Sequence, residues 1–219
     1  MRFFFAQFLI PALLLPATLF ADSWAPPTVR IFSSENGKYL FYAAPMAMKS
    51  FPELPEDKEA NDKERKALGL TEESWGSLFA KEEEKYIGFS NNSFRPVWQA
   101  KLVNEIAPMS AFVSDDGKYV VTTDDYGRLG DGENVVVIYD SEGKLIKRFS
   151  LAAFLAAAEI ERAPQSVSSI NWAGTHKIDT KEQLLLLQVW QSGGIFEKKP
   201  PVFKTIKIRL SDGEILKEK

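Results

Sequence analysis

The chain has 219 residues, a net charge of −3, 12% aromatic residues and no cysteine. This length allows one domain, or two small ones, with a proper hydrophobic core. The near-neutral balance gives no clustered basic face, so we expect no nucleic-acid partner. The absence of cysteine excludes disulfides and a lipid-anchored lipoprotein, and it fits an oxidising compartment.

Residues 1–21 have the layout of a secretory signal peptide. Arg2 precedes a long apolar run that ends at the small residue Ala21, although Leu19 departs from the small residue preferred at that position. An uncleaved membrane anchor is the alternative, because the run approaches the roughly 20 apolar residues needed to span a bilayer. Two prolines interrupt the run and no basic cluster follows it. We therefore expect a periplasmic or secreted protein, associated with the membrane only where the segment is uncleaved.

The rest of the chain, residues 22–219, predicts a single all-β domain. Residues 28–44 alternate in hydropathy around an Asn-Gly pair at Asn36 and Gly37, which is typical of a hairpin. A charged insertion follows over residues 52–85. We expect a short exposed helix over 52–73, supported by ion pairs four residues apart, and a further helical turn over 74–85. A loop without regular structure is the alternative for 52–73.

Strand patterns return after residue 86. Apolar and β-branched runs of strand length predict an antiparallel meander. The expected strands cover 95–104, 109–114, 118–123, 134–140, 143–150, 166–174, 183–194 and 203–218. One docked helix is expected over 150–163, capped by Ser150 and ended by Pro164. Trp98, Trp172 and Trp190 lie among apolar neighbours and are expected in the core.

One phrase recurs four times and marks hairpin turns. Each copy holds a Ser or Asp, further acidic or amide residues, a Gly and then an apolar strand. The copies are SSENGKYLFY at 33–42, VSDDGKYVVT at 113–122, YDSEGKLIKRF at 139–149 and RLSDGEILKE at 209–218. Such repetition favours units that bury their faces against their neighbours.

The stretch SDDGKYVV at 114–121, followed by VVVIYDSEGKL at 135–145, resembles the blades of WD-repeat and TolB-like β-propellers. The resemblance implies blade-like four-stranded sheets, with residues 166–174 as an innermost strand. The chain lacks the Gly-His and Trp-Asp signatures of such blades, and its units are unevenly spaced. An arrangement of two or three blade-like sheets and a β-sandwich are the alternative architectures. The propeller family hosts many unrelated functions, so the resemblance implies no activity.

Few residues offer catalytic or metal chemistry. His176 is the single histidine, so a zinc site with three or four His or Cys ligands is excluded. No G-x-S-x-G motif accompanies His176, and we expect it to be an exposed loop residue. The glycine-rich stretch at 127–132 lacks the Lys-Ser/Thr of a phosphate-binding loop.

The acidic loop at residues 122–134 is the main candidate site. Its carboxylates could gather around Ca²⁺, which accepts six to eight oxygen ligands. The candidate calcium ligands are Asp124, Asp125, Asp131 and Glu133. Tyr126 and Arg128 would join them in a polar binding rim, and Trp75 is a candidate exposed contact. Ordinary turn chemistry is the favoured interpretation, because Asp and Gly suit any long hairpin connection.

Three functions follow from this sequence. The first is an exported, non-catalytic binding or scaffolding module for a protein or carbohydrate partner, without a cofactor. The second is a carbohydrate-acting hydrolase that uses two carboxylates of the 122–134 loop. The third is a structural protein stabilised by calcium.

Overall fold

The computed structural model describes residues 27–46, 73–86, 89–194 and 198–217. The predicted leader and residues 52–72 of the predicted insertion lie outside these ranges. The described residues are mostly antiparallel β-structure, which confirms the all-β prediction.

The described strands form three four-stranded sheets, and each sheet follows chain order. The first sheet contains β1 (Arg30–Ser33), β2 (Tyr39–Ala44), β3 (Trp75–Tyr86) and β4 (Phe89–Lys101). The second contains β5 (Pro108–Val113), β6 (Val120–Asp125), β7 (Val136–Tyr139) and β8 (Leu145–Phe149). The third contains β9 (Lys177–Asp179), β10 (Leu184–Gly194), β11 (Lys199–Arg209) and β12 (Ile215–Leu216). Every neighbouring pair is antiparallel, as a meander requires.

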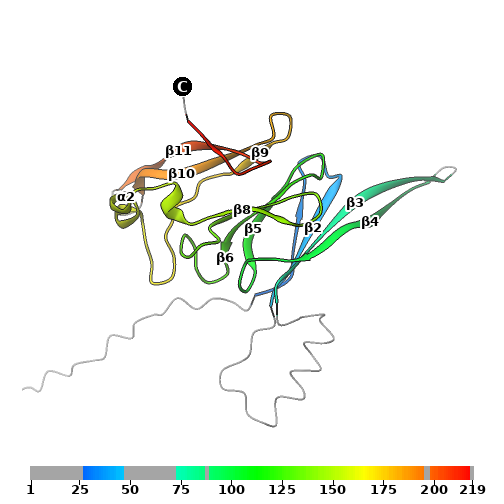
Figure 1. The fold of residues 1–219 in the computed structure, drawn as a ribbon, viewed down its shortest axis with the longest axis horizontal. Coiled ribbons are helices and arrows are strands. Elements are labelled where there is room, and N and C mark those ends of the chain that lie inside the picture. The colour runs from blue at the N-terminus through cyan, green and yellow to red at the C-terminus, as the bar shows by residue number, and fades with distance from the viewer. Residues whose placement is uncertain (1–26, 47–72, 87–88, 195–197, 218–219) are drawn as a thin grey trace, which may run out of the picture.

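The second sheet lies between the other two (Figure 1). One of its faces packs Val120 and Val137 against Phe41 and other side chains of the first sheet. Its other face packs Ile138 against Leu187 and its neighbours in the third sheet. Burial on both faces explains why β6 and β7 read as continuous β-branched runs. Each such buried side chain contributes about 1.5–3 kcal/mol to stability.

The recurrent phrase forms hairpin turns, as predicted. Its four glycines have positive φ angles, at Gly37 (66°), Gly117 (69°), Gly143 (77°) and Gly213 (72°). An acidic or amide side chain caps each turn: the Asp116 carboxylate, for example, accepts a hydrogen bond from the Lys118 amide at 3.1 Å. These polar residues satisfy turn amides that would otherwise lack partners.

The helical turn predicted over 74–85 is wrong, because this segment is strand β3. Its residues pair with β2 on one side and β4 on the other. Gly76, Leu78 and Ala80 are buried, which is the period-two pattern of a strand. Pairing with β4 along the whole of β3, and with β2 as far as Ala80, outweighs the helix propensity of its Lys and Glu residues.

Two further predictions need correction. The helix expected over 150–163 is a 3-10 turn (Leu151–Ala153) followed by the short helix α2 (Ala157–Arg162), and Ser150 makes no side-chain capping bond. Burial of both Phe154 and Leu155 in the core accompanies the break between them. The strand expected over 166–174 is absent; this segment makes only isolated bridges. None of the helices in the described ranges is long and apolar enough to cross a membrane.

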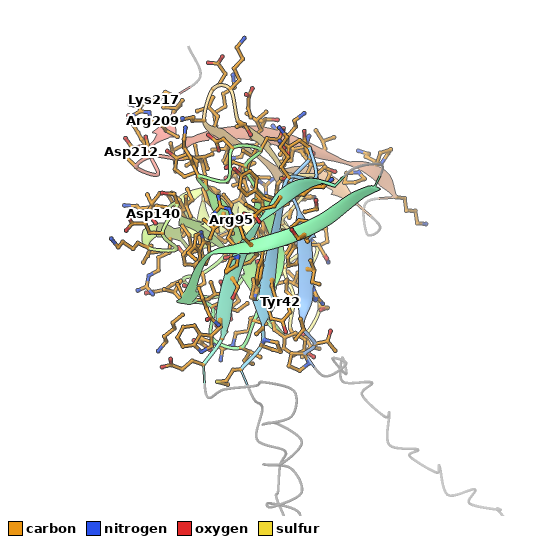
Figure 2. The ribbon with its side chains drawn as sticks, turned by 90° about the vertical axis from the view of Figure 1, so that its right-hand side faces the viewer. Tyr42, Arg95, Asp140, Arg209, Asp212 and Lys217 are labelled. Carbon is orange, nitrogen blue, oxygen red and sulfur yellow. The ribbon has the colours of Figure 1, made fainter. Side chains whose placement is uncertain are left out.

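The first and third sheets each turn one face away from the second sheet. Figure 2 shows the molecule from the side of the first sheet, where Tyr42 is labelled. The β3–β4 hairpin runs across this side and extends beyond β2, whose pairing with β3 stops at Ala80.

Candidate functional site

Two loops meet at one end of the first and second sheets. We call this region the loop end; it comprises residues 102–107, between β4 and β5, and residues 126–135, between β6 and β7. The Tyr126 amide donates to the Ala107 carbonyl at 2.8 Å, and Arg128 forms an ion pair with Glu105 at 3.4 Å. The acidic loop predicted from the sequence is therefore half of this region.

Asp124 fixes the 127–130 part of the loop from inside. Its side chain is 3% exposed, and its carboxylate accepts hydrogen bonds from the Gly130 amide at 2.7 Å and the Trp172 indole at 3.0 Å. Asp124 also has a φ of 54°, a left-handed conformation that Asp tolerates better than most residues. Burial raises the pKa of Asp124 to about 6. Its acceptor positions are thus used by the protein itself.

Asp125 fixes the other loop. Its carboxylate accepts from the side-chain amide of Asn104 at 2.9 Å, from the Glu105 backbone at 3.2 Å and from the side-chain amide of Asn134 at 3.0 Å. The side chain is 4% exposed, and burial raises its pKa. Both neighbouring aspartates therefore hold the 126–135 loop, through Gly130 and Asn134, and Asp125 also joins it to the 102–107 loop.

A buried polar network makes the 102–106 segment rigid. The Val103 amide donates to the Tyr139 hydroxyl at 3.0 Å, while the Val103 carbonyl accepts from Asn134 at 3.0 Å. Thr122 donates to the Asn104 side-chain oxygen at 2.9 Å. Such networks hold a loop in one conformation, since each unmade buried bond is costly; here one buried acceptor, the Asn134 side-chain oxygen, has no partner. Asn104 and Asn134 were not among the site residues predicted from the sequence, where each is only an amide beside an apolar run.

An open groove of about 730 Å³ lies over this rigid segment. Its lining mixes apolar side chains with charges of both signs. The lining residues are Met46, Glu73, Ser74, Lys101, Leu102, Val103, Asn104, Glu105, Ile106 and Arg148. We call it the loop-end groove. A preformed, largely rigid floor is typical of binding sites.

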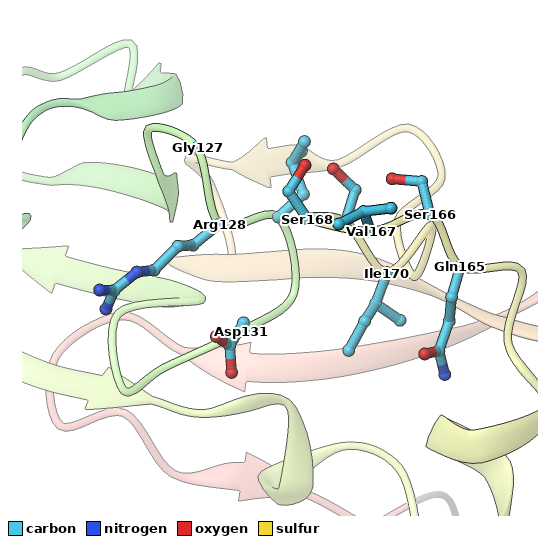
Figure 3. Close-up of a pocket in the computed structure, with 10 residues that line it drawn as sticks. Gly127, Arg128, Asp131, Gln165, Ser166, Val167, Ser168 and Ile170 are labelled. Carbon is cyan, nitrogen blue, oxygen red and sulfur yellow. The ribbon is translucent and has the colours of Figure 1, made fainter. Parts of the chain in front are cut away.

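A second, smaller groove of about 370 Å³ lies on the far side of the loop, between 127–131 and the tight 165–170 hairpin. The two segments are joined by a hydrogen bond from the Ile170 amide to the Leu129 carbonyl at 2.8 Å. Figure 3 shows Arg128 pointing away from the 165–170 hairpin, so its guanidinium does not converge with the serine hydroxyls there. The groove is lined by polar residues, among them Asp131, Gln165 and Ser168, but the Arg128 guanidinium does not join them.

The remaining predicted site residues do not converge on one point. Asp131 and Glu133 are exposed, and Glu133 forms an ion pair with Arg148 at 2.6 Å. Tyr126 is half-buried at the start of the loop. Within the described ranges no three His, Asp or Glu side chains come together in a group that could hold a metal ion. This arrangement favours the structural interpretation of the loop over the calcium interpretation.

The tryptophans offer no open stacking surface in the described residues. Trp98, Trp172 and Trp190 are buried, as predicted. Trp75 lies in β3 rather than in a charged insertion, and its half-buried ring has an indole nitrogen that is shielded and unpaired. The exposed contact expected of Trp75 is therefore limited to part of its ring.

His176 corrects another expectation, because it is buried rather than exposed. Only 7% of it is accessible; its ring stacks on Trp172 at 5.3 Å between centroids and meets Phe112 at 5.8 Å. Its Nδ1 accepts a hydrogen bond from the Gln188 amide at 3.2 Å. Burial lowers the pKa of His176 to about 4, so the ring is neutral at pH 7.

Comparisons with known proteins assign no family to this chain. No protein-family model, no curated protein and no solved structure matches it.

Proposed function

We propose that this chain is an exported, non-catalytic binding module whose loop-end groove takes up an extended segment of a partner protein. The observation that carries the proposal is the groove itself: an open channel over a floor fixed by the buried network around Asn104 and Asp125. A floor that is already ordered adds little entropy cost when a flexible segment binds.

The lining supports a peptide more than a sugar. Met46 and Ile106 offer apolar contacts. Lys101 and Arg148 add cations, which in the free chain form ion pairs with Glu73 and Glu133. Peptide segments combine apolar side chains with backbone and charged groups, which this lining complements. Sugar-binding sites usually present an exposed aromatic ring, whereas the groove lining contains none.

The buried aspartates argue against a hydrolase at this place. Glycoside hydrolysis needs two carboxyl groups facing one cleft. Asp124 and Asp125 are both buried and engaged by donors of the protein itself, and neither lines the loop-end groove. Export is the expectation from residues 1–21, and it places the partner in the periplasm or outside the cell.

Phage display of random peptides tests the proposal. The target is the protein purified from cells that express the full sequence, so that any processing has already taken place. We expect selected peptides to bind, and Arg148→Glu to weaken that binding at least about tenfold, the equivalent of about 1.4 kcal/mol. Lys181→Glu, at the opposite end of the sheets, is the matched control and should leave binding unchanged. Peptides that bind Arg148→Glu as tightly as the parent chain would contradict the proposal. So would a chain that selects no peptide and binds only to arrayed glycans.

A further inference from the structure

The first sheet has an open edge beside the loop-end groove. β4 is the last strand of this sheet, and no strand of the described residues lies beyond it. Lys101, the final residue of β4, lines the groove together with Arg148 of β8, which is the last strand of the second sheet. The loop-end groove therefore borders the edge strands of two sheets.

The ladder between β3 and β4 fixes which backbone groups face this open edge. The Leu102 amide donates to the Ser74 carbonyl at 2.9 Å, so these two residues occupy a hydrogen-bonded position. Hydrogen-bonded and non-hydrogen-bonded positions alternate along an antiparallel pair. Ala100 therefore bonds to β3, whereas the amide and carbonyl groups of Gln99 and Lys101 point away from β3.

The other side of β3 supports this assignment. The Lys81 amide donates to the Lys38 carbonyl at 2.8 Å, so odd-numbered residues of β3 bond to β2 and even-numbered residues bond to β4. Gln99 and Lys101 are exposed, and no backbone hydrogen bond from a turn or loop of the described ranges reaches them. An exposed row of such amide and carbonyl groups is a template for pairing with another extended chain.

The open stretch of β4 is short and has two clear ends. At one end Pro96 has no amide hydrogen, and the register shift beside it leaves Val97 without a partner in β3. At the other end the Val103 amide and carbonyl already bond to Tyr139 and Asn134. Prolines and bulges block pairing at sheet edges, so β4 is blocked at Pro96 and open next to the groove.

The charge of Lys101 does not close this edge. An edge lysine usually discourages the pairing of another strand. Here the Lys101 ammonium forms an ion pair with Glu73, which lies two residues before Trp75, the residue of β3 that pairs with Lys101. Diagonal neighbours of this kind share one face of a sheet, so the ion pair directs the ammonium toward β3 and away from the open edge.

We propose that the partner segment in the loop-end groove continues as an added β-strand along β4, with backbone hydrogen bonds to Gln99 and Lys101. This inference rests on the proposed function and specifies how the segment is held. An extended peptide fits the edge because its backbone repeats a donor and an acceptor at the two-residue spacing that Gln99 and Lys101 present. In strand addition the backbone bonds supply affinity and the side-chain pockets supply specificity, which here is the part of the groove.

Amide hydrogen exchange tests the added strand in the parent protein, purified from cells that express the full sequence. The ligand is a peptide selected by phage display. We expect the Gln99 and Lys101 amides to exchange at least about tenfold more slowly with the peptide bound, because they leave solvent for a hydrogen bond. The Ala100 amide already bonds to β3, so it is the internal control and should change less.

A substitution at the edge gives a second test. Gln99→Pro removes an edge amide that does not bond to β3, and proline is tolerated at such positions. We expect the dissociation constant of the peptide to rise at least about tenfold, the equivalent of about 1.4 kcal/mol. The matched control is Thr205→Pro, which should leave peptide affinity unchanged.

Thr205 suits this control because it also faces an open edge. It lies on β11 opposite Gln188, whose amide bonds to His176 rather than to β11, and β12 pairs only with Lys207 and Ile208. Its sheet, the third, contributes no residue to the groove lining.

The outcomes separate this inference from the proposed function. Peptide binding that Arg148→Glu weakens, with unchanged exchange at Gln99 and Lys101, would overturn the added strand and leave the groove as the binding site. Equal effects of Gln99→Pro and Thr205→Pro would also overturn it. A chain that selects no peptide would overturn the proposed function and this inference together.

Discussion

The two ends of the second sheet use acidic residues in different ways. At one end, hairpin turns meet: the Asn36 amide donates to Asp115 at 2.8 Å, and the Asp115 amide donates to Thr180 at 2.9 Å. Acidic side chains there are exposed or half-buried: Asp116 caps an amide of its own turn, while Asp115 joins two turns. At the loop end, Asp124 and Asp125 are buried and hold segments up to 48 positions away. Burial, rather than residue type or distance along the chain, separates a turn residue from a residue that positions a groove.

The largest effect is expected where a buried aspartate is removed. Asp125→Ala removes the acceptor of three hydrogen bonds, and each buried unmade bond costs about 1–3 kcal/mol. We expect the free energy of unfolding to fall by about 3–5 kcal/mol, which is a large share of the about 5–15 kcal/mol of a typical domain. Urea unfolding at pH 7, followed by tryptophan fluorescence, measures it.

Asp131→Ala is the control for this variant, since Asp131 is exposed in the same loop. Surface changes of this kind are usually within about 0.5 kcal/mol of the parent. Equal losses in the two variants would mean that Asp125 does not hold the 102–106 segment.

The next largest effect is on the pH dependence of folding stability, to which two buried groups contribute in opposite directions. The pKa of buried His176 is about 4 in the folded chain, below its ordinary value of 6.5. The unfolded chain therefore takes up a proton first as pH falls from 6.5 to 4, and folding loses about 3 kcal/mol over this range. The pKa of Asp124 is about 6, above its ordinary 3.8, so protonation of the folded chain adds stability as pH falls through 6.

Substitution separates the two groups. His176→Asn should gain stability relative to the parent as pH is lowered from 7 to 4, and Asp124→Asn should lose it. Urea unfolding at several pH values in this range gives both differences. If the free energy of unfolding changed with pH in the same way in the parent and both variants, burial would not shift the pKa of either His176 or Asp124.

Part of this contrast was accessible from the sequence. The four Gly-containing turns follow from local chemistry, because the turn residues and their bonding partners are neighbours in the chain. Asp124 and Asp125 were predicted as loop residues, because the predicted strand stopped at 123, whereas β6 extends to residue 125 and both side chains are buried. The partners Trp172 and Asn104 depend on packing between distant segments, which hydropathy patterns do not encode.

A smaller effect is expected at the turn end. The Asp116 carboxylate accepts hydrogen bonds from Ser114 at 2.8 Å and from the Lys118 amide at 3.1 Å. Asp116→Ala removes these bonds at a position where water can replace them, so a loss of about 0.5–1.5 kcal/mol is expected. Asp116→Asn keeps an acceptor and is the control. A loss as large as that of Asp125→Ala would remove the distinction between the two ends.

The smallest effect is expected from calcium. The carboxylates of Asp124 and Asp125 are already engaged by amide and indole donors, and Glu133 is paired with Arg148. A cation would have to displace these partners, while Asp131 alone falls far short of the six to eight oxygens that Ca²⁺ takes. We therefore expect the same melting temperature in chelator and in millimolar Ca²⁺, for the parent and for Asp131→Ala alike. A rise of several degrees in Ca²⁺ that Asp131→Ala abolishes would instead make the loop a metal site, and the loop end would then resemble a ligand shell rather than a set of turn and network bonds.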